Sequence, residues 1–269
     1  MNSNSQYYCR WRNPKIYKNS RRRNHSYREH YGADQEEYRK WKISLLDKIL
    51  YLTPKSHCVR SASHPLFTTL YPHFYALDGK KQIPLSLVKS CILPHFLAIL
   101  FMDDGSLSIS HRINLPKKLI YLTPHIYLYL QCYSLKELTF LSNHISKNFS
   151  LVFNISTRND GYGYILKTTS VKETYRFLDI ISPVSKSCES MYYKTSWEYR
   201  FAKEKRKWLS TLPGYSLLAS SSERSKPYSD SEITSLIELK KMGCTTQKIA
   251  DTLKRSYWSV TANWRDINK

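Results

Sequence analysis

The sequence predicts an α+β fold in which one αββαββα unit occurs twice, the first copy incomplete, followed by a small domain of three helices. Helical and strand-like patterns follow one another in that order from residue 97 to about residue 181, and residues 25–77 repeat the order without its leading helix. Three short helical patterns, each with capping residues, come after residue 228. The predicted boundaries are 1–24 (basic segment), 25–209 (core, with halves 25–96 and 97–209), 210–227 (linker) and 228–269 (helical domain).

The chain carries a large excess of positive charge. Its 269 residues include 42 Lys+Arg against 21 Asp+Glu, which gives a formal net charge of +21 at pH 7. An excess of this size implies a polyanionic partner, and it favours nucleic acid over a membrane surface. The sequence has no run of 18 apolar residues, so it predicts no membrane span. It also has no Cys-x-x-Cys pair, which argues against a structural zinc site.

The amino-terminal segment is basic, and no acidic residue occurs before Glu29. We expect it to lie along phosphates as a strand and loop, with DNA contacts from Arg21, Arg22, Arg23 and Arg28. A mitochondrial transit segment is the alternative, because such segments are also rich in arginine and poor in acids. Both the nucleus and the mitochondrion therefore stay open as intracellular locations.

A helix is predicted after this segment, from its N-cap Asp34 to about Leu50. Trp41, Leu45 and Ile49 would form its apolar stripe. Residues 57–71 alternate weakly and predict one or two short strands. Short helices are expected at 72–77 and around 85–91.

The stretch Leu97–Ser106 reads Leu-Ala-Ile-Leu-Phe-Met-Asp-Asp-Gly-Ser and predicts a buried helix that ends at two carboxylates. Gly105 would then lie just past the helix end with a positive φ. The helix dipole disfavours Asp103 and Asp104 at this terminus. A divalent cation held by carboxylate oxygens would explain both acids, and an ordinary Asp-Asp-Gly turn is the alternative.

The region after these acids predicts strands and helices in alternation. The strands are expected at about 106–113, 125–133, 151–157 and 162–168, and the helices at 135–149 and 171–181. Leu138, Leu141 and Ile145 lie on one side of the first of these helices. A basic helix is expected at 196–209.

Four stretches occur in the order found in LAGLIDADG homing endonucleases: Ser63–Phe67, Gly79–Pro84, Leu97–Ser106 and Met191–Lys194. Over about residues 20–200, the chain resembles the branch of that family with two motif halves in one chain. The resemblance implies two saddle-shaped sheets of four strands that lie in the major groove of double-stranded DNA. It also implies two central motif helices whose terminal carboxylates hold Mg²⁺ or Mn²⁺ for hydrolysis of both strands.

The same resemblance assigns roles to individual residues. Asp104 matches the catalytic, metal-binding acid, with Asp103 as its neighbour, and Lys81 and Lys194 match the lysines that polarise the phosphate or its bound water. For the two lysines, plain phosphate contact or solvated charge is the alternative. Arg112, Arg158 and Lys167, in or beside the predicted strands, are expected to contact DNA.

One departure from the family pattern bears on activity. The first motif is expected within residues 1–24, which contain no Asp or Glu, and Ile99 stands where the family name has Gly. Three explanations stay open: a homodimer supplies a second Asp104, a segment has been lost and a DNA binder is left, or an asymmetric site nicks one strand. A DNA-binding regulator, or a maturase that binds intron RNA, would tolerate the loss of one carboxylate.

The last region resembles a Myb/SANT-type helix-turn-helix. Ser229 or Asp230, Thr245 or Thr246, and Ser256 would cap its three helices. In that fold the third helix enters the major groove. The implied DNA contacts are Arg255, Ser256, Trp258, Ser259, Asn263 and Arg265. A helical bundle for protein contact is the alternative.

Overall fold

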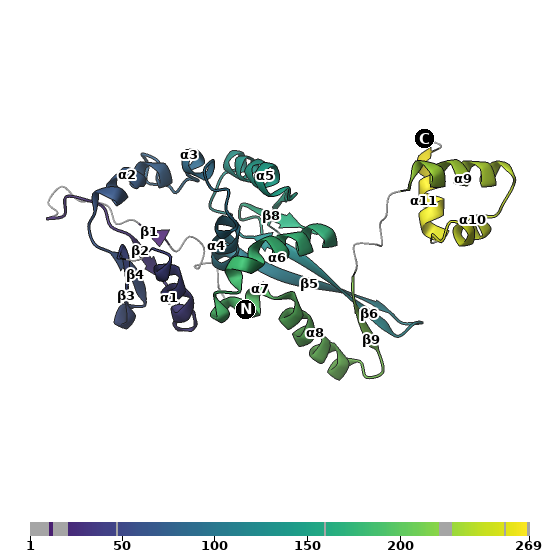
Figure 1. Cartoon of the computed structure of the whole chain (residues 1–269), viewed down its shortest axis with the longest axis horizontal. Coiled ribbons are helices and arrows are strands. Elements are labelled where there is room, and N and C mark those ends of the chain that lie inside the picture. Colours follow the sequence, from purple (N-terminus) through teal and green to yellow (C-terminus); the bar gives the residue numbers. More distant parts are fainter. Residues whose placement is uncertain are drawn as a thin grey trace. The chain divides into compact units, whose positions relative to one another are not determined.

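The computed structural model describes the backbone of residues 11–12 and residues 21–46, 48–158, 160–220, 228–255 and 257–267, without the side chain of Trp258. The chain forms two compact units, Met1–Ser221 and Ser222–Lys269 (Figure 1). Within these ranges, no helix combines the length and the apolar character needed to cross a membrane. Most of the basic segment 1–24 lies outside the described residues.

The first half of the larger unit contains an antiparallel sheet with the strand order β1-β2-β4-β3. Its strands are β1 (Trp11–Arg12), β2 (Arg28–His30), β3 (Leu50–Thr53) and β4 (Cys58–Ser61). Its helices are α1 (Glu36–Ser44), α2 (Pro65–Phe74) and α3 (Leu85–Val88), and short 3₁₀ turns occur at Ala33–Gln35 and Pro54–Ser56.

The predicted helix at 34–50 is too long. Helix α1 ends at Ser44, and Leu45 and Ile49 are exposed, so the predicted apolar stripe is wrong for these two residues, whereas Trp41 packs against the core. Tyr38 and Arg39 are the buried residues of this helix. The chain instead enters strand β3 at Leu50, within reach of β4.

The strand prediction for 57–71 holds only for β4, because helix α2 begins at Pro65. Proline is favoured in the first turn of a helix, and the Nδ1 atom of His64 accepts a hydrogen bond from the Leu66 N–H at 3.2 Å as a cap. The weak alternation of this stretch hid both signals. The separate helix expected at 72–77 is the end of α2.

The second half repeats the topology of the first with its leading helix present. Its elements are α4 (Pro94–Asp104), β5 (Gly105–Asn114), β6 (Leu119–Leu128), α5 (Leu135–Phe149), β7 (Asn154–Thr157), β8 (Tyr164–Thr168) and α6 (Val171–Ser185). The strand order β5-β6-β8-β7 corresponds position by position to β1-β2-β4-β3. This correspondence is expected if the two halves are copies of one unit.

The main core lies between the second sheet and helices α4, α5 and α6 (Figure 1). Leu138, Leu141 and Ile145 are buried there, as their helical spacing predicted, and Ser134 and Glu137 form a capping box at the start of α5. The predicted strand at 125–133 is displaced, because β6 begins at Leu119 and pairs with β5 along ten residues. This hairpin determines the register of the sheet.

The expected positive φ at Gly105 is wrong. Gly105 has φ −95° and ψ 170°, because β5 begins there without an intervening turn. A Cβ atom at this position would lie 2.2 Å from the Phe101 Cδ2 atom and 2.7 Å from the Phe101 carbonyl oxygen. Glycine is therefore required for space, not for backbone conformation.

The end of the larger unit wraps back onto the second sheet. A 3₁₀ turn (Glu189–Met191), α7 (Tyr192–Thr195) and α8 (Trp197–Thr211) lead to β9 (Ser216–Ala219), which pairs parallel with β6. A strand thus forms inside the predicted linker 210–227. The segment can pair there because β8 occupies only residues 126–128 of β6.

The smaller unit consists of α9 (Asp230–Lys241), α10 (Thr246–Thr252) and α11 (Tyr257–Ile267). Leu236, Ile249, Ala250 and Val260 form its core. Ser229 and Thr245 accept hydrogen bonds at the starts of α9 and α10, as expected of caps. Ser256, the expected third cap, lies outside the described residues.

Candidate functional site

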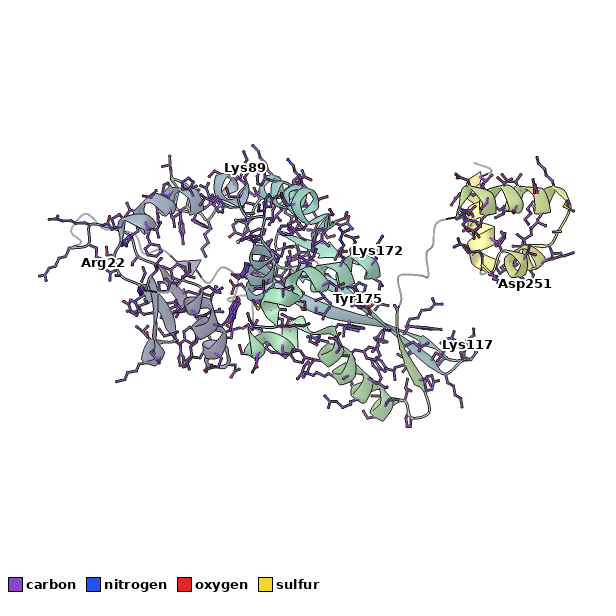
Figure 2. The ribbon with its side chains drawn as sticks, in the orientation of Figure 1. Arg22, Lys89, Lys117, Lys172, Tyr175 and Asp251 are labelled. Carbon is purple, nitrogen blue, oxygen red and sulfur yellow. The ribbon has the colours of Figure 1, made fainter. Side chains whose placement is uncertain are left out.

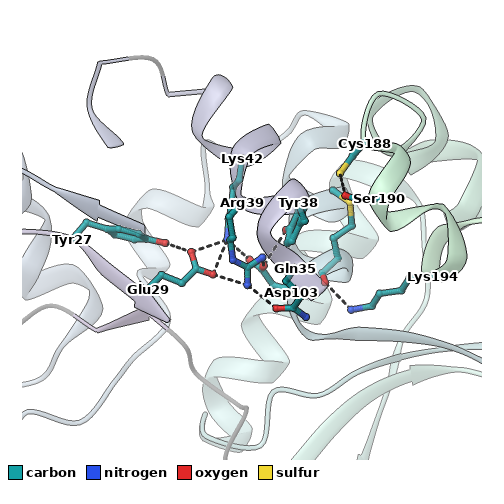
Figure 3. A network of polar contacts seen from close by, with 11 residues as sticks. Tyr27, Glu29, Gln35, Tyr38, Arg39, Lys42, Asp103, Cys188, Ser190 and Lys194 are labelled. Atoms are coloured by element: carbon teal, nitrogen blue, oxygen red, sulfur yellow. Dashed lines mark hydrogen bonds and ion pairs between the residues drawn. The ribbon is translucent and has the colours of Figure 1, made fainter. Parts of the chain in front are cut away.

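The two motif acids lie at the carboxyl end of α4, and Asp103 is engaged by helix α1 (Figure 3). Its Oδ2 atom accepts a hydrogen bond from the Lys42 Nζ atom at 2.7 Å, and its Oδ1 atom accepts one from the Tyr38 hydroxyl at 2.9 Å. The Arg39 Nη1 atom lies 3.6 Å from Oδ1. Asp103 is therefore neutralised by side chains of the first half.

Glu29 of β2 shares the same two cations. Its carboxylate lies 3.0 Å from the Arg39 Nη2 atom and 3.3 Å from the Lys42 Nζ atom, and it accepts a 2.6 Å hydrogen bond from the Tyr27 hydroxyl. We call Glu29, Arg39, Lys42 and Asp103 the inter-half ion cluster. Its two acids and two bases balance, which buried charges require.

The electrostatics of this cluster follow from its geometry. Partial burial alone would raise the pKa of the Asp103 carboxyl, but the Lys42 and Arg39 cations lower it below its ordinary value. Burial, followed by the charge of Asp103, raises the pKa of the Tyr38 hydroxyl well above its ordinary value. At neutral pH Asp103 is thus ionised and Tyr38 keeps its proton.

The surroundings of Asp104 are different. Its carbonyl oxygen accepts a hydrogen bond from the Tyr129 N–H at 2.8 Å, and its side chain is half-buried. Burial first, and then the charges of Asp104 and Glu137, raise the pKa of the Tyr133 hydroxyl to about 12. Asp104 therefore lies close enough to Tyr133 to affect the pKa of its hydroxyl.

The structure brings Lys194, one of the predicted lysines, to the end of α4. The Lys194 Nζ atom, from α7, donates a 2.6 Å hydrogen bond to the carbonyl oxygen of Met102 (Figure 3). Lys81 lies on the segment after α2, where it bridges to Tyr75. Tyr75 also acts on the pKa of Tyr133, so this segment approaches the same region as Asp104.

The carboxylates present do not form a metal cage. Among the described residues, no group of three or more His, Cys, Asp or Glu side chains could hold a metal ion. Mg²⁺ in nucleotide-processing sites is commonly held by one or two carboxylates together with substrate phosphates. Asp104 fits a cation shared with a DNA phosphate, whereas Asp103, expected as its partner, is occupied by Lys42 and Tyr38.

The second sheet presents a polar face on the side opposite its core. Register pairs Arg112 with Tyr121 and Lys167 with Tyr127, and both pairs alternate with the buried residues of β6. Serines and further polar side chains complete this face: Ser106, Ser108, Ser110, Thr123, His125 and Asn154. Lys117 lies exposed at the tip of the β5–β6 hairpin (Figure 2).

The first sheet has a corresponding basic face. Arg28 lies directly opposite Arg60, and Tyr51 follows in the same register. Two like charges on neighbouring strands repel each other unless an anion lies between them. The Arg60 Nε atom is buried and makes no hydrogen bond within the described part of the chain. Arg21, Arg22 and Arg23 are exposed, and Figure 2 shows Arg22 at the margin of this half.

Two arginines expected at DNA form ion pairs within their own units. Arg158 pairs with Asp160 through two nitrogen atoms in the β7–β8 turn. Arg255 donates to both oxygens of Glu232, at 2.9 Å and 2.8 Å, and lies over the Tyr228 ring. Both guanidinium groups therefore stabilise local structure, which the sequence could not reveal.

The remaining residues expected at DNA in the smaller unit differ in exposure. Ser259 lies 3.3 Å from the Tyr228 hydroxyl, and Asn263 is half-buried with an oxygen that lacks a hydrogen bond. Arg265 is exposed on the same stripe of α11 as Tyr257 and Thr261. Ser256 and the Trp258 side chain lie outside the described residues.

Comparison with known proteins bears on this arrangement. A model of the LAGLIDADG DNA endonuclease family matches residues 14–174, more than half of the chain. No curated protein matches the sequence.

Solved structures similar to the chain include the homing endonuclease I-WcaI bound to its DNA recognition sequence. The TM-score is 0.51 and the sequence identity 19%, over 69% of this chain and 80% of that one. The amino-terminal LAGLIDADG domain of DUF199/WhiA aligns with a TM-score of 0.33 and 19% identity, over 59% of this chain and 73% of that one. The first of these likenesses supports the fold.

Proposed function

Since this chain belongs to the LAGLIDADG DNA endonuclease family, we propose that it binds double-stranded DNA and cuts phosphodiester bonds with the help of Mg²⁺ or Mn²⁺. The polar faces of the two sheets would hold the duplex, and Asp104 would be the metal-binding acid. I-WcaI, whose fold this chain resembles, is bound to its DNA recognition sequence in the solved structure.

The observation that carries DNA binding is the cross-strand pair Arg28 and Arg60 on the outer face of the first sheet. The two like charges lie on neighbouring strands, and a phosphate oxygen or a guanine edge would compensate them. Arg112 and Lys167 give the second sheet a basic face of the same kind. Aromatic and hydroxyl side chains between these cations suit a wet interface with bases.

The chemistry would take place at the carboxyl end of α4. A divalent cation bound by Asp104 would stabilise negative charge on the scissile phosphate as a Lewis acid. Lys194, which holds the Met102 carbonyl oxygen, lies beside this position and would offset phosphate charge. Lys81 would act from the opposite segment.

The smaller unit would add affinity through a helix-turn-helix contact in the major groove. We assign this contact to the exposed α11 stripe of Tyr257, Thr261 and Arg265, since Arg255 is committed to Glu232. A single module of this size buries limited area, so the sheets would define the long target.

A second candidate function is DNA binding without cleavage. The pairing of Asp103 with Lys42 and Tyr38 favours it, because these contacts occupy one of the two motif acids. Double-strand cutting would then need a second Asp104 from a homodimer. A maturase that binds intron RNA on the same faces falls in this second class.

The test is incubation of the purified chain with a randomised duplex library in Mg²⁺, beside the Asp104→Asn variant. Double-strand cuts that vanish in the variant would support the endonuclease and a second copy of the acid. Nicks that vanish would indicate one active strand site. Selective retention of duplex without any cut would reject cleavage in favour of a DNA reader. Preference for single-stranded RNA would reject both DNA functions and favour the maturase.

A further inference from the structure

The carboxyl end of helix α4 carries two acids, Asp103 and Asp104, which the helix dipole disfavours at this terminus. Lys194 covers the Met102 carbonyl oxygen, and the Tyr129 N–H covers that of Asp104. The charge of Asp103 is compensated by Lys42 and Arg39, which lie on a helix of the other half. The end of α4 is thus held from both halves of the unit.

Helix α1 is itself fixed in this position. Tyr38 is fully buried in the core of the second half, and the Trp41 Nε1 atom donates a 3.0 Å hydrogen bond to the Ser187 hydroxyl. Arg39 and Glu29 are almost completely buried, with side chains 1% and 3% exposed. The cations that hold Asp103 therefore have little freedom to move.

Adjacent residues on an α-helix point about 100° apart, so a fixed Asp103 also fixes the direction of Asp104. A displacement of about 1 Å at a reacting group can cost on the order of 100-fold in rate. The Asp103 carboxylate is occupied by Lys42 and Tyr38. These contacts can act on the reaction through its neighbour.

We propose that Asp103 is a positioning residue: its ion pairs with Lys42 and Arg39 lock the carboxyl end of α4 to the first half and orient the Asp104 carboxylate. This inference rests on the proposed function of Asp104. It assigns to α1, a helix outside the two-acid motif, a role in the assembly of the active site.

The test compares Lys42→Met and Asp103→Asn with Lys40→Met, a control on the same helix. Lys40 is half-exposed and pairs with Glu36 and Glu37 in its own helix. Thermal unfolding, duplex affinity in EDTA, Mn²⁺ retained by the DNA complex (counted by electron paramagnetic resonance) and the cleavage rate at saturating DNA would be measured. Lys42→Arg preserves the charge and should recover most of the rate.

We expect the two cluster variants to bind DNA within about threefold of the wild type, while the rate at saturating DNA falls 30- to 100-fold and Mn²⁺ binds more weakly. A purely structural role would lower the melting temperature and the affinity together. Wild-type rate and Mn²⁺ retention in a folded Asp103→Asn protein would overturn the inference alone. A wild-type complex that neither retains Mn²⁺ nor cuts would overturn the proposed cleavage, and the inference with it.

Discussion

Gly105 lies against Phe101, four residues earlier in the chain, with no room between them for a side chain. The Phe101 ring is fully buried and packs edge-on against Phe177 of α6, with ring centroids 5.2 Å apart. A Cβ atom on Gly105 would approach the ring at 2.2 Å and the Phe101 carbonyl oxygen at 2.7 Å. The helix-to-strand junction behind Asp104 therefore requires glycine.

Gly105→Ala should destabilise the larger unit by about 1–3 kcal/mol, because either the ring or the start of β5 must move. Gly32→Ala is the matched control. Gly32 has φ −77° and open space around a new Cβ atom, so alanine there should be neutral or stabilise by about 0.4–1 kcal/mol. Urea unfolding of both variants measures the difference, and equal stabilities would contradict the steric argument.

Asp104→Asn should abolish cutting while DNA binding persists. Loss of the carboxylate removes several kcal/mol of charge stabilisation, which corresponds to a rate decrease on the order of 10²- to 10³-fold. Duplex affinity should stay within about threefold, because the basic residues on the faces of the two sheets are unchanged. Asp179→Asn, an exposed change on α6, is the control. Equal rates for the two variants would remove Asp104 from the mechanism.

Arg60→Met should weaken duplex binding and reduce its salt dependence. Each phosphate contact contributes about 0.9 to the slope of log K against log salt, so the slope should fall by about that amount if Arg60 binds phosphate. Lys136→Met provides the comparison, because Lys136 is exposed on α5, which covers the opposite, core side of the second sheet. Fluorescence anisotropy at four or more salt concentrations gives both slopes. An unchanged slope for Arg60→Met would exclude a phosphate contact.

Parts of this fold could be predicted because their signals are local. Helix α5 combines a capping box with a 3.6-residue apolar period, and both survive in the structure. Helix α2 and strand β3 were missed, since the first has only a histidine cap and a proline, and the second is four residues long. Gly105 was placed correctly at a helix end but for the wrong physical reason.

The candidate site likewise contains some residues that local sequence signals indicate and others that they do not. Asp104 and Lys194 could be found from short motifs, and the structure brings both to one helix end. The partners of Asp103 could not be found from such motifs, because Lys42 and Tyr38 lie 61 and 65 residues away along the chain. A buried arginine such as Arg39 has no periodic signature, since helix patterns assign charged residues to the solvent side.

The smaller unit should lose stability in acid through the pair formed by Glu232 and Arg255. The guanidinium of Arg255, with the Ser229 N–H, lowers the pKa of Glu232 from 4.5 to about 2. Because the pKa of Glu232 is lower in the folded state, the ion pair stabilises the unit at pH values above the ordinary pKa. This stabilisation is lost as the pH falls through the folded-state pKa. After correction for the intrinsic pH dependence of exchange, hydrogen exchange of the α9 amides in the full chain should therefore become faster as the pH falls from about 5 to about 2.

The Arg255→Met variant should not show this acid-induced increase in exchange. Glu238→Gln, an exposed change on the same helix, should still show it. The same acid profile in Arg255→Met and the wild type would show that the ion pair contributes nothing, and would return Arg255 to the residues available for DNA.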